Sequence, residues 1–143
     1  MCITSDASPW GIGAVLTKEG LPIAWLADQI RQEDLDRFNA TLGDSAFTTT
    51  WEALAILVSL RRQEFLGNPR FAFRSDSLGA LSAIAKMASP SKGLALVLKE
   101  IALDEAGQTG GFETLTHIPG VSNTLADPCP EFTHRMQKRS LRY

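Results

Sequence analysis

Short runs, most of them apolar, occupy the first third of the chain, and turn residues separate these runs. Residues 3–7, 12–16 and 21–27 are predicted to form strands, because Pro9-Trp10-Gly11 and Lys18-Glu19-Gly20 stand between them as turn signals. Short connections of this kind join antiparallel neighbours. The pattern therefore predicts an antiparallel meander of three strands.

A helical repeat replaces these short runs in the middle of the chain. Residues 28–47 are polar and irregular, which is typical of a surface crossing with a short helical turn. Apolar residues then recur at the spacing of one helix face and predict a helix over residues 50–65, ended by Gly67-Asn68-Pro69. The residues that carry this repeat are Trp51, Leu54, Ala55 and Val58.

Helices and strands alternate in the second half. Strands are predicted over residues 70–75 and 112–118, with two helices over 77–88 and 91–106 between them and a short final helix over 122–127. The side chains expected to face the core are Leu78, Leu81, Ile84 and Ala85 in the first of these helices and Leu94, Val97, Leu98 and Ile101 in the second.

This order of elements, β-β-β-α-β-α-α-β-α, predicts the fold class. A meander followed by helical crossovers gives a mixed sheet, antiparallel at one side and parallel at the other, with helices on its faces. The expected architecture is therefore α/β of the mixed α+β kind. Residues 1–127 are expected to form one domain, and residues 128–143 a basic tail that contains prolines.

Composition limits the class of protein further. The chain has 143 residues, of which 44% are hydrophobic and 21% charged, as in a soluble globular protein. Apolar runs fall short of the roughly 18–20 residues of a membrane span, and nothing at the N-terminus resembles a signal peptide. Cys2 and Cys129 fit neither a disulfide framework nor a zinc motif. We therefore expect an intracellular protein, cytoplasmic or nuclear, without a membrane partner.

Charge is distributed unevenly along the chain. The net charge is −2, yet residues 71–143 carry eight basic against seven acidic residues, whereas residues 1–70 carry six against nine. The basic residues at the C-terminus are Arg135, Lys138, Arg139 and Arg142. Such a tail could lie along a phosphate backbone, but it is more often simply a solvated terminus.

Four acidic residues stand where predicted elements begin or end. Asp6 closes the first strand, Glu52 opens the long helix, Asp76 follows the fourth strand, and Asp127 follows Asn123-Thr124-Leu125-Ala126. Carboxylates from separate element ends can converge on one point, where oxygen ligands suit Mg2+. Two such ions about 3.5–4 Å apart can drive phosphodiester hydrolysis.

Each acid also has a purely structural explanation. Asp6 precedes Ser-Pro and could form a turn. Glu52 completes the Thr-x-x-Glu pattern of a capping box with Thr49. Asp76 could be the N-cap of the following helix, and Asp127 could be an ordinary exposed loop acid. Their common placement relative to the strands and helices favours the metal-binding interpretation for the set.

Four segments, in order, match the motifs of one known family. They are Thr4–Leu16, which contains Asp-Ala-Ser-Pro-Trp-Gly, then Thr49–Ile56, Arg74–Ser77, and His117–Asp127, which contains His-Ile-Pro-Gly and ends in Ala-Asp. Together they resemble the ribonuclease H domain of reverse transcriptases from gypsy-type LTR retroelements. The resemblance covers most of the chain. It implies a five-stranded mixed sheet whose first three strands are antiparallel, in agreement with the predicted topology.

The resemblance also implies an activity. A protein of this family is a metal-dependent endonuclease that hydrolyses the RNA strand of RNA–DNA hybrids. By this resemblance Asp6, Glu52, Asp76 and Asp127 would hold two Mg2+ ions, for which Mn2+ can substitute, with Asp6 bridging them. The expected partners are the hybrid itself and a polymerase domain, covalently attached or not.

Further residues match the family pattern near these acids. His117 corresponds to a histidine that assists proton transfer or product release, although a structural hydrogen bond at the strand end is an equal alternative. Ser77 and Thr50 could donate hydrogen bonds to phosphates from helix N-termini, and Asn123 could orient its loop or touch the substrate.

Two other functions remain open. A catalytically degenerate domain of the same fold could serve as a nucleic-acid-binding or spacer module beside a polymerase, and the Asp127-Pro128 junction favours it. Another ribonuclease H-like nuclease, such as a transposase or integrase core, is disfavoured by the Asp-Ala-Ser-Pro-Trp-Gly segment.

Overall fold

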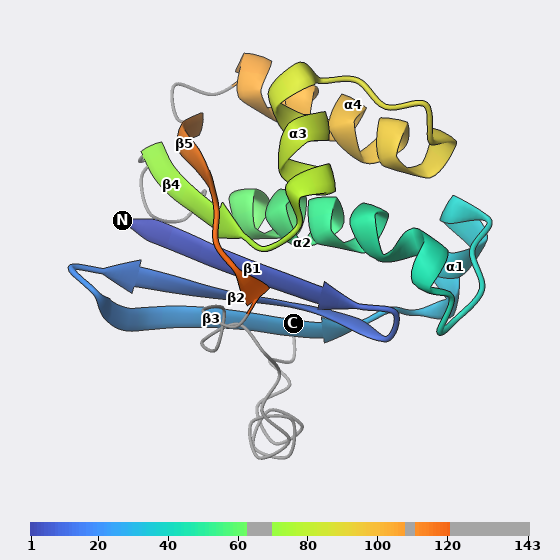
Figure 1. Cartoon of the computed structure of the whole chain (residues 1–143), viewed down its shortest axis with the longest axis horizontal. Helices are drawn as coiled ribbons and strands as arrows, with labels where there is room; N and C mark the ends of the chain where they lie inside the picture. Colours follow the sequence, from blue (N-terminus) through green and yellow to red (C-terminus); the bar gives the residue numbers. More distant parts are fainter. Residues whose placement is uncertain (63–69, 108–110, 121–143) are drawn as a thin grey trace.

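A computed structural model describes residues 1–62, 70–107 and 111–120, and all structural statements below concern these residues. They form a five-stranded sheet in the order β3-β2-β1-β4-β5, with helices packed on one face (Figure 1). Both the mixed sheet and the flanking helices were predicted. Within the described part of the chain, no helix is long and apolar enough to cross a membrane.

The three N-terminal strands form the predicted antiparallel meander. They are β1 (Cys2–Ser8), β2 (Gly11–Lys18) and β3 (Leu21–Gln29), each longer than the sequence pattern indicates. The turn between β2 and β3 consists of Glu19 and Gly20, whose φ angles are +54° and +81°. Positive φ at both central residues is typical of the tight turns that suit the twist of a hairpin.

Parallel pairing places the ends of three strands at one edge of the sheet. β4 (Arg70–Ser75) pairs in parallel with the central strand β1, and β5 (Gly111–His117) pairs in parallel with β4. Parallel neighbours require crossover connections, which the helices provide. The carboxyl ends of β1, β4 and β5 therefore face the same way, and this edge receives the segments that leave β1 and β4.

The long helix α2 (Thr48–Arg62) lies at the centre of the helical layer. It packs on β1 and β2 and against α3 (Leu78–Lys86) and α4 (Lys92–Gly107). Because it is covered on several sides, its buried residues extend around much of its circumference. They are Thr50, Trp51, Glu52, Ala53, Ala55, Ile56, Leu57 and Ser59. At its C-terminal end, Arg61 forms ion pairs with Glu100 and Asp104 of α4, both at 2.7 Å.

The predicted surface crossing contains more helix than expected. Residues 28–47 include α1 (Gln32–Phe38) and a single 3-10 turn, η1 (Ser45–Phe47). In α1 the Asp34 carboxylate accepts a hydrogen bond from the Arg31 backbone N–H at 2.9 Å, which caps the helix start. Leu35 is the buried residue of this helix, in a cluster with Trp51. One buried residue in seven gives too weak a periodic signal to predict the helix.

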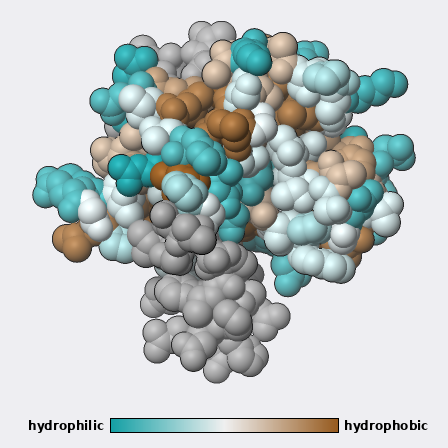
Figure 2. Space-filling view, viewed as in Figure 1, coloured by the Kyte–Doolittle hydropathy of each residue, from teal (hydrophilic) through white to brown (hydrophobic). Residues whose placement is uncertain are grey.

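The buried face is as predicted in α4 and partly different in α3. Leu94, Val97, Leu98 and Ile101 are all buried, which confirms the prediction for α4. In α3 the prediction is wrong at two positions, because Leu78 is 66% exposed and Ala85 is also exposed. The buried side of α3 instead includes Ala80 and Ala83, whose small side chains allow close approach to the neighbouring layer. Figure 2 shows apolar side chains among polar ones on this helical side of the molecule.

Gly43 is expected to be intolerant of a side chain. Its φ is +82°, and a Cβ there would lie 2.7 Å from Trp10 Cη2. Gly20 has nearly the same φ of +81° but nothing within 4 Å of its Cβ position, so Gly20→Ala is a control for backbone strain alone. We expect Gly20→Ala to lower the free energy of unfolding by about 1 kcal/mol and Gly43→Ala by about 1–2 kcal/mol, because the exposed Trp10 side chain must also move aside. Urea denaturation measures both, and equal losses would rule out the steric contribution of Trp10.

Candidate metal centre

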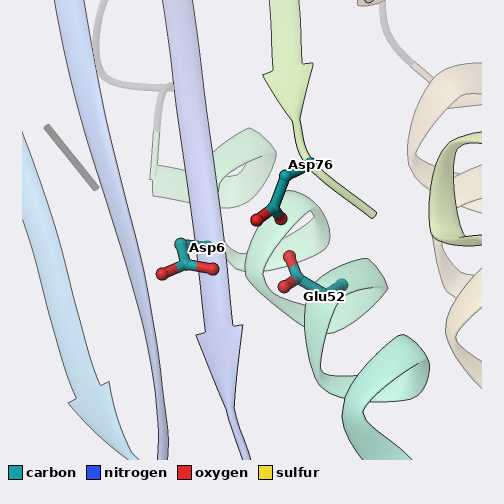
Figure 3. Close-up of side chains that lie close together, drawn as sticks. All are labelled: Asp6, Glu52 and Asp76. Carbon is teal, nitrogen blue, oxygen red and sulfur yellow. The ribbon is translucent and has the colours of Figure 1, made fainter. Parts of the chain in front are cut away.

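Three carboxylates from three separate elements meet at the carboxyl edge of the sheet. Asp6 comes from β1, Glu52 from the N-terminal half of α2, and Asp76 from the residue that follows β4 (Figure 3). Each offers an oxygen atom, and these atoms all lie within 4.8 Å of one another. The predicted convergence of these three residues is therefore present in the structure.

The sheet register explains how the two aspartates come together. β1 and β4 run side by side in parallel, with Ile3 opposite Phe73, so that both chains reach the same edge. Asp6 lies opposite Gly13 of β2, which has no side chain to compete for the space. α2 begins close to this edge and packs on β1, which brings Glu52 between the two strands.

Glu52 is the buried member of the cluster, with an exposed fraction of only 3%. Its Oε1 accepts a hydrogen bond from the Ala7 backbone N–H at 3.0 Å, and its Oε2 accepts one from the Ser75 hydroxyl at 3.4 Å. The carboxylate thus connects α2 to both central strands of the sheet. Asp6 and Asp76 are half-buried and give the cluster its access to solvent.

The electrostatics of the cluster favour a bound cation. Burial, followed by the negative charge of Asp6 and then that of Asp76, raises the pKa of Glu52 to about 8, against the opposing hydrogen bonds from Ala7 and Ser75. Glu52 therefore resists ionisation at neutral pH unless positive charge is placed beside it. A donor set made only of carboxylate oxygens fits hard cations such as Mg2+ or Mn2+.

The structural alternatives for Glu52 and Asp76 are both wrong. No capping box forms at Glu52, because α2 already begins at Thr48 and the carboxylate contacts Ala7 rather than the Thr49 backbone. Asp76 is not the N-cap of α3. That position belongs to Ser77, whose Oγ accepts a hydrogen bond from the Ala80 backbone N–H at 3.3 Å. Neither acid is thus needed to cap a helix.

The end of β5 and the residues that follow it pack against Asp76. The Nε2 of His117 lies 3.1 Å from the backbone oxygen of Asp76, and because a carbonyl can only accept, Nε2 carries the proton. The Ile118 N–H donates to the backbone oxygen of Ser75 at 3.0 Å. Gly120 lies so near that a Cβ there would be 3.1 Å from the Asp76 Oδ2. The predicted structural hydrogen bond of His117 is therefore present.

Of the other predicted site residues within the described part of the chain, one is buried and one adjoins the cluster. Thr50 is 3% exposed and lies beside Gly93 of α4, so its hydroxyl is not available to a phosphate on the surface. Ser77 is half-buried at the start of α3, next to Asp76. Asn123 and Asp127 lie outside the described residues, as do the predicted helix over 122–127 and the tail over 128–143.

The sequence reasoning missed Ser75, whose hydroxyl holds Glu52 and also accepts a hydrogen bond from the Ser77 N–H at 3.1 Å. A signal for it existed. Strand alternation puts position 75 on the same face as Phe71 and Phe73, both buried, so a hydroxyl there needs a polar partner inside the protein.

Comparisons with known proteins bear on the fold. No protein-family model matches the chain, and no curated protein matches its sequence. Among solved structures, RNase H1 from the archaeon Halobacterium salinarum NRC-1 is similar with a TM-score of 0.69 at 19% identity, over 93% of this chain and 96% of that one.

Two further structures are similar. LC11-RNase H1, solved in complex with an RNA/DNA hybrid, has a TM-score of 0.69 at 20% identity, over 88% of this chain and 90% of that one. The N-terminal RNase H domain of rv2228c from Mycobacterium tuberculosis has a TM-score of 0.63 at 17% identity, over 89% and 94% of the two chains. Since these matches span nearly the whole of both chains, the chain has the ribonuclease H fold.

Proposed function

We propose that this chain is a metal-dependent endonuclease that hydrolyses the RNA strand of RNA–DNA hybrids, as the ribonuclease H part of a gypsy-type retroelement reverse transcriptase. One observation carries the proposal. The oxygens of Asp6, Glu52 and Asp76 lie within 4.8 Å of one another in a ribonuclease H fold. A similar structure, LC11-RNase H1, was solved with an RNA/DNA hybrid, which supports the choice of substrate.

The residues have distinct roles in this proposal. Asp6, on the central strand β1, would be shared by two Mg2+ ions, and Glu52 and Asp76 would be further ligands of these ions. Asp127 would complete the ligand set. The chemistry that such ions supply is activation of water and stabilisation of the leaving oxygen in an in-line displacement. Ser77 and Asn123 would contact the substrate, and a polymerase domain would accompany the chain.

A direct assay tests the proposal. The purified chain is incubated with a hybrid labelled on either strand, in Mg2+ or Mn2+, beside double-stranded DNA of the same sequence. We expect cleavage of the RNA strand only. A well-folded protein that binds the hybrid and leaves it intact in both metals would instead be the degenerate, nucleic-acid-binding form of the fold. Such a result would contradict the proposed nuclease activity.

Mg2+ is expected to stabilise the folded protein. A preformed cluster binds the ion in the native state and not in the unfolded chain, so saturating Mg2+ should raise the free energy of unfolding by about 2–4 kcal/mol at 100 to 1,000 times its Kd. Thermal melting in EDTA and in Mg2+ measures the change. Because the cluster selects divalent ions, NaCl at the same ionic strength should not produce this stabilisation.

A further inference from the structure

The segment His117–Gly120, which we term the β5 extension, contacts Asp76 and its neighbour Ser75 at three points. The His117 ring contacts the Asp76 backbone oxygen, the Ile118 N–H contacts the neighbouring backbone oxygen of Ser75, and Gly120 approaches the Asp76 side chain. The first two contacts fix the main chain at the end of β4. The third borders the carboxylate that faces Glu52 and Asp6.

The absence of a side chain at Gly120 is explained by this approach and not by its backbone. Gly120 does not have the positive φ seen at Gly20 and Gly43, so an alanine could adopt its conformation without strain. Its Cβ, however, would meet Asp76 Oδ2 at 3.1 Å, which is tighter than ordinary van der Waals contact. The carboxylate would have to move by a few tenths of an ångström.

We propose that Gly120 is a positioning residue that keeps the Asp76 carboxylate where Mg2+ can bind, and thereby sets the preference of the site for Mg2+ over larger divalent ions. The proposal rests on the metal binding of the proposed function. Mg2+ demands nearly ideal octahedral geometry at about 2.0–2.1 Å from each oxygen, whereas larger ions tolerate displaced ligands. A small shift of one carboxylate therefore weakens Mg2+ binding most.

His117 supports the same carboxylate through the main chain. Its ring N–H is engaged by the Asp76 carbonyl, which ties the end of β5 to the residue that carries the ligand. Loss of this donor should let Asp76 and its side chain move together. A glutamine at 117 retains an N–H donor at a similar reach, whereas an alanine has none.

The test measures metal binding directly, by calorimetric titration of Mg2+ and of Mn2+ into metal-free protein without nucleic acid. For Gly120→Ala we expect a loss of Mg2+ affinity of about tenfold, the lower end of the range for groups that orient metal ligands, and a loss of Mn2+ affinity of less than about threefold. Gly93→Ala is the matched control, because its Cβ would make only ordinary contacts at 3.5 Å or more, with Phe38 and Thr50.

Two results would overturn the inference. One is unchanged Mg2+ affinity in Gly120→Ala, and the other is an equal loss for both ions. His117→Ala should also weaken Mg2+ binding while His117→Gln restores it; a histidine that acts only in proton transfer would leave Mg2+ affinity unchanged in both. If the unaltered chain binds neither ion, the proposed function itself fails, which the titration of that protein distinguishes at the outset.

Discussion

Asp76→Asn should abolish cleavage of an RNA–DNA hybrid, with a fall in rate of about 10³-fold or more in Mg2+. The substitution keeps the shape of the side chain and its place beside Gly120. It removes the charge that one member of the cluster contributes toward a cation, while lessening the repulsion on Glu52. The folded protein should therefore be at least as stable as before, so the lost activity cannot be attributed to unfolding.

The measurement is a single-turnover cleavage assay, accompanied by urea denaturation of each variant. Asp104→Asn is the matched control: it makes the same chemical change in α4, where Arg61 can still donate to the amide oxygen. Cleavage that persists in Asp76→Asn at a similar rate would place the active site elsewhere on the molecule or reveal a contaminating nuclease.

Glu52→Gln should stabilise the metal-free protein and remove most of its pH dependence above pH 5. The pKa of Glu52 is raised from its ordinary value of 4.5 to about 8, chiefly because the group is buried. Glutamine has no charge to bury, and its amide can keep hydrogen bonds to the Ala7 N–H and the Ser75 hydroxyl. The expected gain at pH 8 is on the order of 2–4 kcal/mol.

The sign follows from proton binding. Between pH 4.5 and about 8 the folded protein retains a proton on Glu52 that the unfolded chain has lost, so rising pH favours unfolding across this window. Below pH 4.5 both states are protonated, and the variant should match the parent. Urea denaturation in EDTA at pH 5 and pH 8 tests this, with the exposed Glu33→Gln as control. Destabilisation by Glu52→Gln at both pH values would contradict the prediction.

The sequence predicts the two aspartates of the candidate site more directly than it predicts Glu52. Asp76 is marked by the strand that precedes it, and Asp6 by its place near the end of the strand predicted over residues 3–7. Parallel pairing then brings those ends together. Glu52 is harder to assign, because an acid near a helix start also fits a cap. What decides between the two is where α2 begins, and a boundary that differs by two residues changes the partner of the carboxylate.

Tertiary packing accounts for what the sequence could not predict. The periodicity of α4 gives the correct buried face because one side of that helix meets α2 and the other meets solvent. In α3 the small residues Ala80 and Ala83 are buried at the interface, whereas Leu78 is exposed. Hydrophobicity alone would place leucine inside in preference to alanine. The sequence identifies the β5 extension only as part of a motif. The contact of Gly120 with Asp76 could not be predicted, because it depends on the register between β4 and β5.

The hydrogen bonds of Glu52 to Ala7 and Ser75 determine how heat should inactivate the domain. One side chain ties the central helix to two strands whose sequences are far apart, so the ligand cluster and the tertiary structure assemble together. Local fraying of α2 would withdraw the Glu52 carboxylate from both strands, while Asp6 and Asp76 would stay on the paired strands β1 and β4. Inactivation by heat should therefore begin with the detachment of α2, at or before the temperature at which the sheet unfolds.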